Sequence, residues 1–193
     1  MKYDLTKHRR RSIRLKDFDY SRPGAYFVTV VTQGRLPFFG NIVDGQTRLS
    51  DEGVVTCQCW QLIAEHFSNV SLDEFVVMPN HLHGIVIMEP VGARHAVPLH
   101  NTTEHFGAPL AGTIPTIIRS FKSAVTKEIR NLQKKPVFRV WQRNYYEHVI
   151  RSEESLSRIR EYITNNPFNW ESDPENPSRP LGLSQHAAEA WKV

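Results

Sequence analysis

The stretch VVMPNHLHGIVIM, residues 76–88, contains the turn around which the predicted fold is organised. Apolar and β-branched residues, which favour strands, flank the turn-forming dipeptide Pro79-Asn80. Because proline has no backbone N–H for a sheet, one continuous strand through the whole stretch is unfavourable. The sequence therefore predicts an antiparallel hairpin, with residues 71–78 in its first arm and residues 81–88 in its second.

Two histidines, His81 and His83, begin the second arm and are separated by Leu82. Side chains alternate along a strand, so both imidazoles project from the same face. Two neutral imidazoles at this spacing can bind one divalent metal ion. The chain has 9 histidines in 193 residues, so an H-x-H pair also arises by chance. A pair of hydrogen-bonded core histidines therefore stays open beside the metal site.

The other predicted elements surround this hairpin. An alternating apolar pattern predicts a strand over 25–32, and two serines and one threonine precede helical patterns as N-caps. The first capped helix runs from Ser50 to about Phe67, the second from Thr113 through residues 114–133, and the third from Ser152 to its end at Pro167. The segment VFRVWQ (137–142) is predicted as a further strand. The order β-α-β-β-α-β followed by a helix predicts an α+β, ferredoxin-like fold. Its antiparallel sheet would carry packed helices and a C-terminal helix.

The length of 193 residues predicts one domain with extensions. We expect a basic N-terminal extension over 1–20, a globular domain over 21–170 and a C-terminal tail over 171–193. Residues 89–112 lack periodicity and predict a long loop within the domain.

Basic residues are concentrated at the N-terminus. Residues 1–16 hold seven lysines and arginines, among them Arg9, Arg10 and Arg11, against the single acid Asp4. The whole chain has a net charge of +4 and a pI near 9.2. This block favours nucleic acid as a partner, and a solvated tail is the alternative.

The sequence contains neither a membrane-spanning apolar run nor a signal-peptide pattern, so we expect a cytoplasmic protein without a membrane partner. Cys57 and Cys59 are too close on a predicted helix to cross-link the fold. They are expected to be reduced, half-buried apolar residues.

The final helix carries two polar residues of interest. Tyr162 and Asn166 are four residues apart and share one face. At about 100° per residue, Tyr162 lies roughly 90° from the centre of the apolar stripe formed by Leu156, Ile159 and Ile163. Its hydroxyl can therefore emerge where core meets solvent, and Asn166 can offer an amide oxygen to a metal. An interfacial tyrosine and a helix C-cap are the alternatives.

The pair of segments MPNHLHGIVIM (78–88) and WQRNYYEHVIRSEESLSRIREYITNNP (141–167) resembles the single-tyrosine HUH transposases of insertion sequences, and most of all the REP-associated tyrosine transposases (RAYT). The resemblance covers about residues 20–170. It implies that His81, His83 and Asn166 bind a divalent metal, Mg²⁺ or Mn²⁺, and that Tyr162 is the nucleophile. It further implies a single-stranded DNA endonuclease and strand transferase that forms a 5′-phosphotyrosine, acting at hairpin-forming repeats.

Several other residues are candidates for binding single-stranded or hairpin DNA. Tyr145 and Tyr146 can stack on bases, and phosphate contacts are expected from Arg119, Lys122, Arg139, Arg143 and Arg151. The sequence is compatible with a homodimer. Two other functions stay open: a non-catalytic nucleic-acid-binding module of the same fold that descends from a transposase, and a metal hydrolase that uses an activated water.

Overall fold

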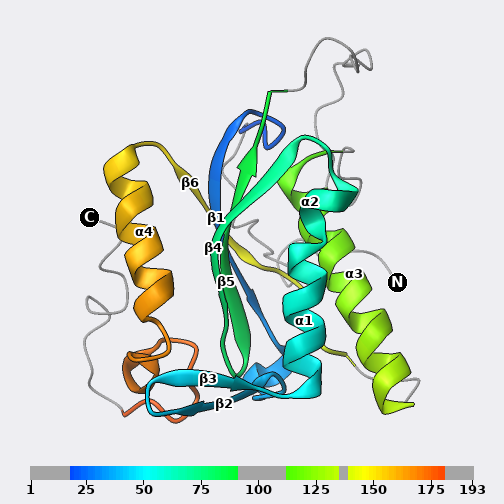
Figure 1. Cartoon of the computed structure of the whole chain (residues 1–193), viewed down its shortest axis with the longest axis vertical. Helices are drawn as coiled ribbons and strands as arrows, with labels where there is room; N and C mark the ends of the chain where they lie inside the picture. Colours follow the sequence, from blue (N-terminus) through cyan, green and yellow to red (C-terminus); the bar gives the residue numbers. More distant parts are fainter. Residues whose placement is uncertain (1–17, 91–111, 135–138, 181–193) are drawn as a thin grey trace, which may run out of the picture.

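The computed structural model describes residues 18–90, 112–134 and 139–180 (Figure 1). The predicted DNA contacts Arg9, Arg10 and Arg11, and nearly all of the loop 89–112, lie outside these ranges. None of the helices within them is long and apolar enough to cross a membrane.

The central sheet has four antiparallel strands in the order β4-β5-β1-β6. The strands are β1 (Gly24–Val31), β4 (Val70–Val77), β5 (His81–Met88) and β6 (Tyr146–Ile150). The predicted hairpin around Pro79-Asn80 joins β4 to β5, and β5 pairs with β1 so that His81 lies opposite Val31. This element and strand order confirms the predicted α+β, ferredoxin-like fold.

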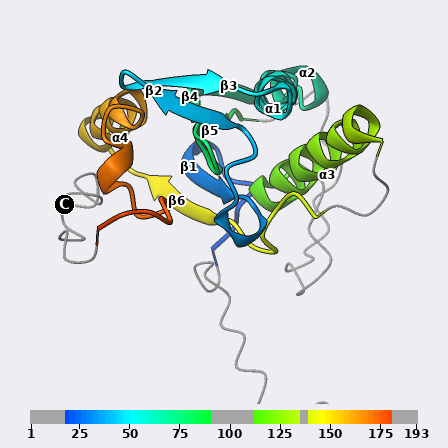
Figure 2. The same cartoon turned by 90° about the horizontal axis from the view of Figure 1, so that it is seen from below.

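Helices cover both faces of the sheet. α1 (Asp51–Gln61), α2 (Ile63–His66) and α3 (Ile114–Gln133) lie on one face, and α4 (Glu153–Asn165) lies on the other (Figures 1 and 2). The alternation along β1 divides the core, since Tyr26 and Val28 join the core under α1 and α3, whereas Phe27 joins the core under α4. His81 and His83 fall on the α4 face because they alternate with the buried Leu82 of the other core.

Local sequence signals account for the helices. The side chains of Ser50 and Ser152 accept hydrogen bonds from the backbone N–H groups of Gly53 and Ser155, as capping residues do. The four-residue stripe of α3, predicted to face the core, is buried at Ile117, Phe121, Val125 and Ile129. The first predicted helix is split at Leu62, where α1 ends and α2 begins.

Two features differ from the prediction. Residues 40–49 form a hairpin of β2 (Gly40–Val43) and β3 (Gln46–Leu49), for which the sequence analysis predicted no strands. The structure describes residues 139–142 of the predicted strand VFRVWQ (137–142), and there the prediction is wrong. These residues make a single bridge, from Trp141 to Thr32. Val140 and Trp141 are consecutive, yet both pack in the core under α1 and α3, whereas consecutive side chains of a strand point to opposite faces. The fourth strand of the sheet is β6.

The sheet and α1 approach closely behind the histidines. A Cβ atom placed on Gly84, next to His83, would lie 2.3 Å from Cζ2 of the buried Trp60. Only glycine leaves room for the indole ring at this point of β5, so the packing of α1 fixes the strand that carries both imidazoles.

Candidate active site

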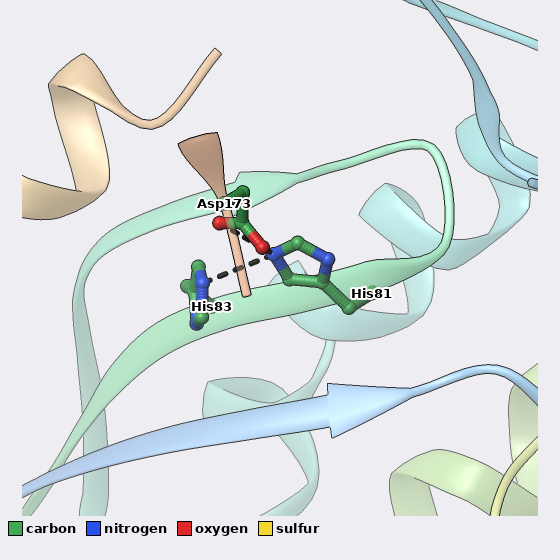
Figure 3. A group of neighbouring side chains, drawn as sticks. All are labelled: His81, His83 and Asp173. Carbon is green, nitrogen blue, oxygen red and sulfur yellow. Dashed lines mark hydrogen bonds and ion pairs between the residues drawn. The ribbon is translucent and has the colours of Figure 1, made fainter. Parts of the chain in front are cut away.

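His81 and His83 occupy the start of β5 and form the centre of a buried polar cluster. They are 0% and 4% exposed, and their Nε2 atoms lie 3.0 Å apart (Figure 3). The strand alternation predicted from the sequence therefore does bring both imidazoles to one point.

Asn80 orients the ring of His81. The Nδ1–H of His81 donates a 2.8 Å hydrogen bond to Oδ1 of Asn80, whose side-chain amide donates to the carbonyl oxygens of Arg35 and Glu175 at 3.1 and 2.7 Å. Since a side-chain carbonyl only accepts, the proton of His81 is on Nδ1 and a lone pair is on Nε2. The sequence analysis treated Asn80 only as a turn residue. The position directly before the first histidine was the available signal.

Thr29 orients the ring of His83 from the neighbouring strand. Its hydroxyl lies 2.8 Å from Nδ1 of His83, and the ring of Phe27 stacks on the imidazole at 5.3 Å between centroids. When Nδ1 donates to Thr29, the Nε2 lone pairs of both histidines face each other. A cation that accepts both lone pairs removes their repulsion and selects this tautomer.

Asp173 is the acidic member of the cluster, and the sequence analysis missed it. Its Oδ2 atom lies 3.9 Å from Nε2 of His81, and one atom each of His81, His83 and Asp173 lie within 4.8 Å of one another (Figure 3). The carboxylate is 4% exposed, and its Oδ1 atom accepts a 2.6 Å hydrogen bond from the backbone N–H of Glu175. No periodic pattern marks Asp173, because it follows the last helix in the predicted tail.

Asn166, the residue predicted as the third metal ligand, lies beside the cluster at the end of α4, where its amide binds Asp173. Nδ2 of Asn166 donates a 3.0 Å hydrogen bond to Oδ2 of Asp173. Oδ1 of Asn166 is buried and has no hydrogen-bond partner among the described residues. A buried carbonyl oxygen without a partner is costly and is a suitable ligand for a hard cation.

The donor set fits a divalent metal ion. Two imidazole nitrogens, one carboxylate and one amide oxygen are all groups that bind divalent metals, and the cluster has none of the thiolates typical of closed structural zinc sites. Burial, together with the charge of Arg35, lowers the pKa of His81 to about 3. Burial, together with the neighbouring His81, lowers the pKa of His83 well below its usual value. Both rings are therefore neutral, as metal ligands must be, across the physiological pH range.

Tyr162 reaches the cluster from α4. Its hydroxyl lies 3.2 Å from Nε2 of His83, and its ring meets the edges of His83 and Phe27. The side chain is half-buried, at the boundary of core and solvent. Arg160 attaches α4 to β4 through three hydrogen bonds to Asp73, at 3.0, 3.2 and 2.6 Å, and thereby fixes the helix that carries Tyr162.

The other predicted DNA contacts lie apart from this cluster. Lys122, Arg139 and Arg143 line a groove beside α3, on the opposite face of the sheet. Arg119 is exposed on α3 outside that groove, and Arg151 is exposed between β6 and α4. The cationic residues thus do not form one patch with the histidines.

Three of these predicted contacts have distinct surroundings. Nζ of Lys122 donates to the carbonyl oxygens of Gln142, Arg143 and Asn144 at 2.5, 3.4 and 3.2 Å, and burial lowers its pKa to about 8. Tyr145 packs against the core under α1 and α3. Tyr146 lies opposite Thr29 in the sheet and is 36% exposed, so it shares the face of the histidines.

Known proteins supply a family context. No protein-family model matches the sequence. An uncharacterized protein of Haemophilus influenzae is 45% identical over 174 residues, 89% of this chain and 96% of the relative. A candidate REP-associated tyrosine transposase of the same organism is 25% identical over 149 residues, 77% of this chain and 73% of that protein. A solved REP-associated tyrosine transposase bound to a REP hairpin superposes with a TM-score of 0.55 at 17% identity, over 81% of this chain and 74% of the other, and so has the same fold.

Proposed function

We propose that this chain is a metal-dependent single-stranded DNA endonuclease and strand transferase. It belongs to one family with the uncharacterized Haemophilus influenzae protein, and it is a distant homologue of the REP-associated tyrosine transposases. The observation that carries the proposal is the position of Tyr162. Its hydroxyl contacts Nε2 of His83 at the edge of a buried His-His-Asp cluster that fits a divalent metal.

The proposed reaction uses Tyr162 as the nucleophile. The phenolic oxygen attacks the scissile phosphorus, the bond from phosphorus to the 3′-oxygen breaks, and the phenolic proton is transferred overall to that 3′-oxygen. The products are a 5′-phosphotyrosine and a free 3′-hydroxyl, so no bond energy is lost and a second 3′-hydroxyl can reverse the step. A divalent metal held by His81, His83 and Asp173 would supply charge stabilisation to the phosphate oxygens.

The protein's own groups give the tyrosine its position. α4 is held against the sheet by Ile159 and Ile163 and by the ion pair of Arg160 with Asp73, so the position of the half-buried Tyr162 is fixed. Tyr162 and both histidines come from one chain. The proposed reaction therefore needs no second copy, and the homodimer that the sequence allows stays a separate prediction.

The proposed substrate is single-stranded DNA next to a hairpin. The hairpin is supported by a solved structure of the same fold, a REP-associated tyrosine transposase bound to a REP hairpin. The half-buried position of Tyr162 suits an unpaired strand, since the scissile phosphate must come within bonding distance of this helix side chain.

The test is a covalent-adduct assay. The protein is incubated with Mn²⁺ and a hairpin oligonucleotide that has a single-stranded flank and a label at its 3′ end, and the products are separated under denaturing conditions. The wild-type protein should retain the label, and Tyr162→Phe should not. Tyr26→Phe, which removes a phenol at the far end of β1, should behave as the wild type.

Two results contradict the assignment in different ways. An adduct formed by Tyr162→Phe shows that another residue is the nucleophile. Cleavage with no adduct by any variant indicates the metal hydrolase with an activated water.

A non-catalytic nucleic-acid-binding module is the second candidate function. The cationic groove beside α3 favours it, because that groove lies on the other face of the sheet and needs no metal. Salt-dependent binding of hairpins by a wild-type protein that cuts none of them with Mg²⁺ or Mn²⁺ is the result that this function predicts.

A further inference from the structure

Arg35 lies at the end of the sheet that carries the histidines. β1 ends opposite His81, and the short 3-10 helix Gln33–Arg35 follows it. Thr32, between them, donates its backbone N–H to the carbonyl oxygen of Asn80 at 2.8 Å. Arg35 therefore belongs to a loop that is attached to the chain directly before His81.

The backbone of Arg35 has an uncommon conformation that Asn80 holds in place. Its φ angle is 57°, in the left-handed region that glycine favours. The amide of Asn80 donates to the carbonyl oxygen of Arg35 at 3.1 Å, while Oδ1 of Asn80 accepts from Nδ1–H of His81. A conformation of this kind persists where its surroundings fix it, and such residues are concentrated at functional sites. One asparagine therefore positions both a candidate metal ligand and this arginine.

The guanidinium group of Arg35 is a cation at the rim of the histidine cluster. Its Nε atom donates a 2.7 Å hydrogen bond to Oε2 of Glu175, two residues beyond Asp173, and its side chain is 49% exposed. Burial and, after it, the charge of Arg35 lower the pKa of His81 to about 3, so the guanidinium lies within electrostatic reach of the cluster. A guanidinium group has further N–H donors on its two Nη atoms, in a fork that matches a phosphate.

Arg35 and Tyr162 lie at opposite ends of the histidine pair along β5. The hydroxyl of Tyr162 contacts Nε2 of His83, the second histidine, whereas Arg35 lies beyond the first (Figure 3). In a phosphoryl transfer the attacking and leaving oxygens lie roughly in line on opposite sides of the phosphorus. A phosphate at the cluster that is attacked from the side of Tyr162 therefore releases its 3′-oxygen toward the side of Arg35.

We propose that Arg35 binds the phosphate directly 5′ of the scissile one and so keeps the strand that ends in the free 3′-hydroxyl in place for joining. This inference rests on the proposed function for the identity of the scissile phosphate. In the joining step the 3′-hydroxyl oxygen attacks the phosphorus of the phosphotyrosine, the bond from phosphorus to the phenolic oxygen breaks, and the proton passes overall to that oxygen. The strand with the 3′-hydroxyl has no covalent bond to the protein, so only contacts of this kind retain it.

The test uses two variants of the full chain at Arg35. Arg35→Gln removes the charge, and Arg35→Lys keeps the charge without the fork. Arg22→Gln, at an exposed site before the other end of β1, is the control. For binding, each is combined with Tyr162→Phe so that the DNA stays intact. The probe is the hairpin oligonucleotide with a single-stranded flank, in a series in which one flank phosphate at a time is a neutral methylphosphonate.

One phosphate should show the contact. Neutralising it should weaken binding about tenfold in the parent and in the Arg22→Gln protein, but less than about twofold in Arg35→Gln. Adduct mapping should place it directly 5′ of the cleaved phosphate. With the unmodified probe, Arg35→Gln should reduce the slope of log K against log salt by about 0.7, and Arg35→Lys should restore the slope. The Mn²⁺ affinity of Arg35→Gln should not fall, which separates a lost phosphate contact from damage to the cluster.

Joining is measured in proteins that retain Tyr162, with an added oligonucleotide that supplies a 3′-hydroxyl. The ratio of joined product to covalent adduct should fall about tenfold in Arg35→Gln and stay unchanged in Arg22→Gln. An unchanged ratio in Arg35→Gln overturns the role in joining.

The binding series separates this inference from the proposed function. If the wild-type protein forms the adduct and Arg35→Gln responds to every methylphosphonate as the parent does, the nuclease function stands and the Arg35 contact fails. A lost response on the 3′ side of the cleaved bond also overturns the proposal. If one response is lost in Arg35→Gln but the wild-type protein forms no adduct, the phosphate contact is confirmed, whereas the nuclease function and the role in joining fail.

Discussion

The side-chain amide of Asn166 donates a 3.0 Å hydrogen bond to Oδ2 of Asp173, the oxygen that lies 3.9 Å from Nε2 of His81. The residue expected to be the third metal ligand thus holds a carboxylate that the sequence analysis did not single out. Its own Oδ1 atom stays buried without a hydrogen-bond partner among the described residues. Asp173 and Asn166 can therefore act together, one as a charged and one as a neutral oxygen donor.

Replacement of Asp173 by Asn should weaken Mn²⁺ binding at least about tenfold, and more than Asn166→Ala does. Asp173 is the acidic member of the cluster, and a carboxylate attracts a hard cation more strongly than an amide does. Calorimetric titration with Mn²⁺ measures the difference. Asp44→Asn, a change of the same kind at the exposed turn between β2 and β3, is the control. Unchanged affinity in Asp173→Asn rules out the carboxylate as a ligand.

Asn80→Ala should lower both stability and metal affinity. It removes the acceptor of His81 Nδ1–H and leaves the carbonyl oxygens of Arg35 and Glu175 without this donor. We expect a loss of about 2–3 kcal/mol in the free energy of unfolding and a roughly 10- to 100-fold loss in Mn²⁺ affinity. Urea denaturation and metal titration measure the two effects. Asn41→Ala, at an exposed site in β2, should change neither, and a normal metal affinity in Asn80→Ala would refute the orienting role.

The metal-free protein should lose stability as the pH falls below about 6.5. Burial lowers the pKa of His81 to about 3 and that of His83 well below normal, so below pH 6.5 the unfolded chain takes up protons that the folded chain does not. Each proton changes the free energy of unfolding by up to about 1.4 kcal/mol per pH unit, and this stabilisation is fully present only above the unfolded pKa. Urea midpoints between pH 5 and 8 should fall less steeply with acid for His81→Gln than for the wild type. His66→Gln, at an exposed site, should leave the slope unchanged.

Gly84→Ala should destabilise the protein by at least about 2 kcal/mol. The added methyl group would lie 2.3 Å from Cζ2 of Trp60, inside a close-packed core. Thermal or urea unfolding measures the loss. If the clash is the cause, the double variant with Trp60→Phe should lose less than the sum of the single variants, because the smaller ring makes room. Additive losses would assign the effect to β5 itself.

Phe168→Ala should weaken the binding of unpaired DNA by roughly 5- to 100-fold, the range expected for one lost base stack. The ring is 81% exposed, so its removal should leave the unfolding free energy nearly unchanged. Fluorescence anisotropy with a short single-stranded oligonucleotide measures the affinity. Phe168→Tyr should bind as the wild type and Phe168→Leu as the alanine variant. Full binding by Phe168→Leu would indicate an apolar contact in place of stacking.

Most of the fold could be predicted from local patterns. The turn at Pro79-Asn80, the caps at Ser50 and Ser152, and the apolar stripe of α3 each have a short-range physical cause, and all are confirmed. The strand predicted at 137–142 failed over its described residues because apolar content alone does not produce a strand. There Val140 and Trp141 are both buried, and the ammonium group of Lys122 donates a hydrogen bond to the carbonyl oxygen of the next residue, Gln142.

The sequence by itself determined that His81 and His83 share one side of a strand and that Tyr162 stands at the edge of an apolar helix face, because periods of 2 and 3.6 are local properties of the backbone. Only the tertiary structure decided which groups meet there. The packing of α4 on β5 brings Tyr162 to His83 across 79 residues, and the turn after α4 brings Asp173 to both histidines. These contacts depend on how separate elements dock, and no periodicity in the chain encodes that docking.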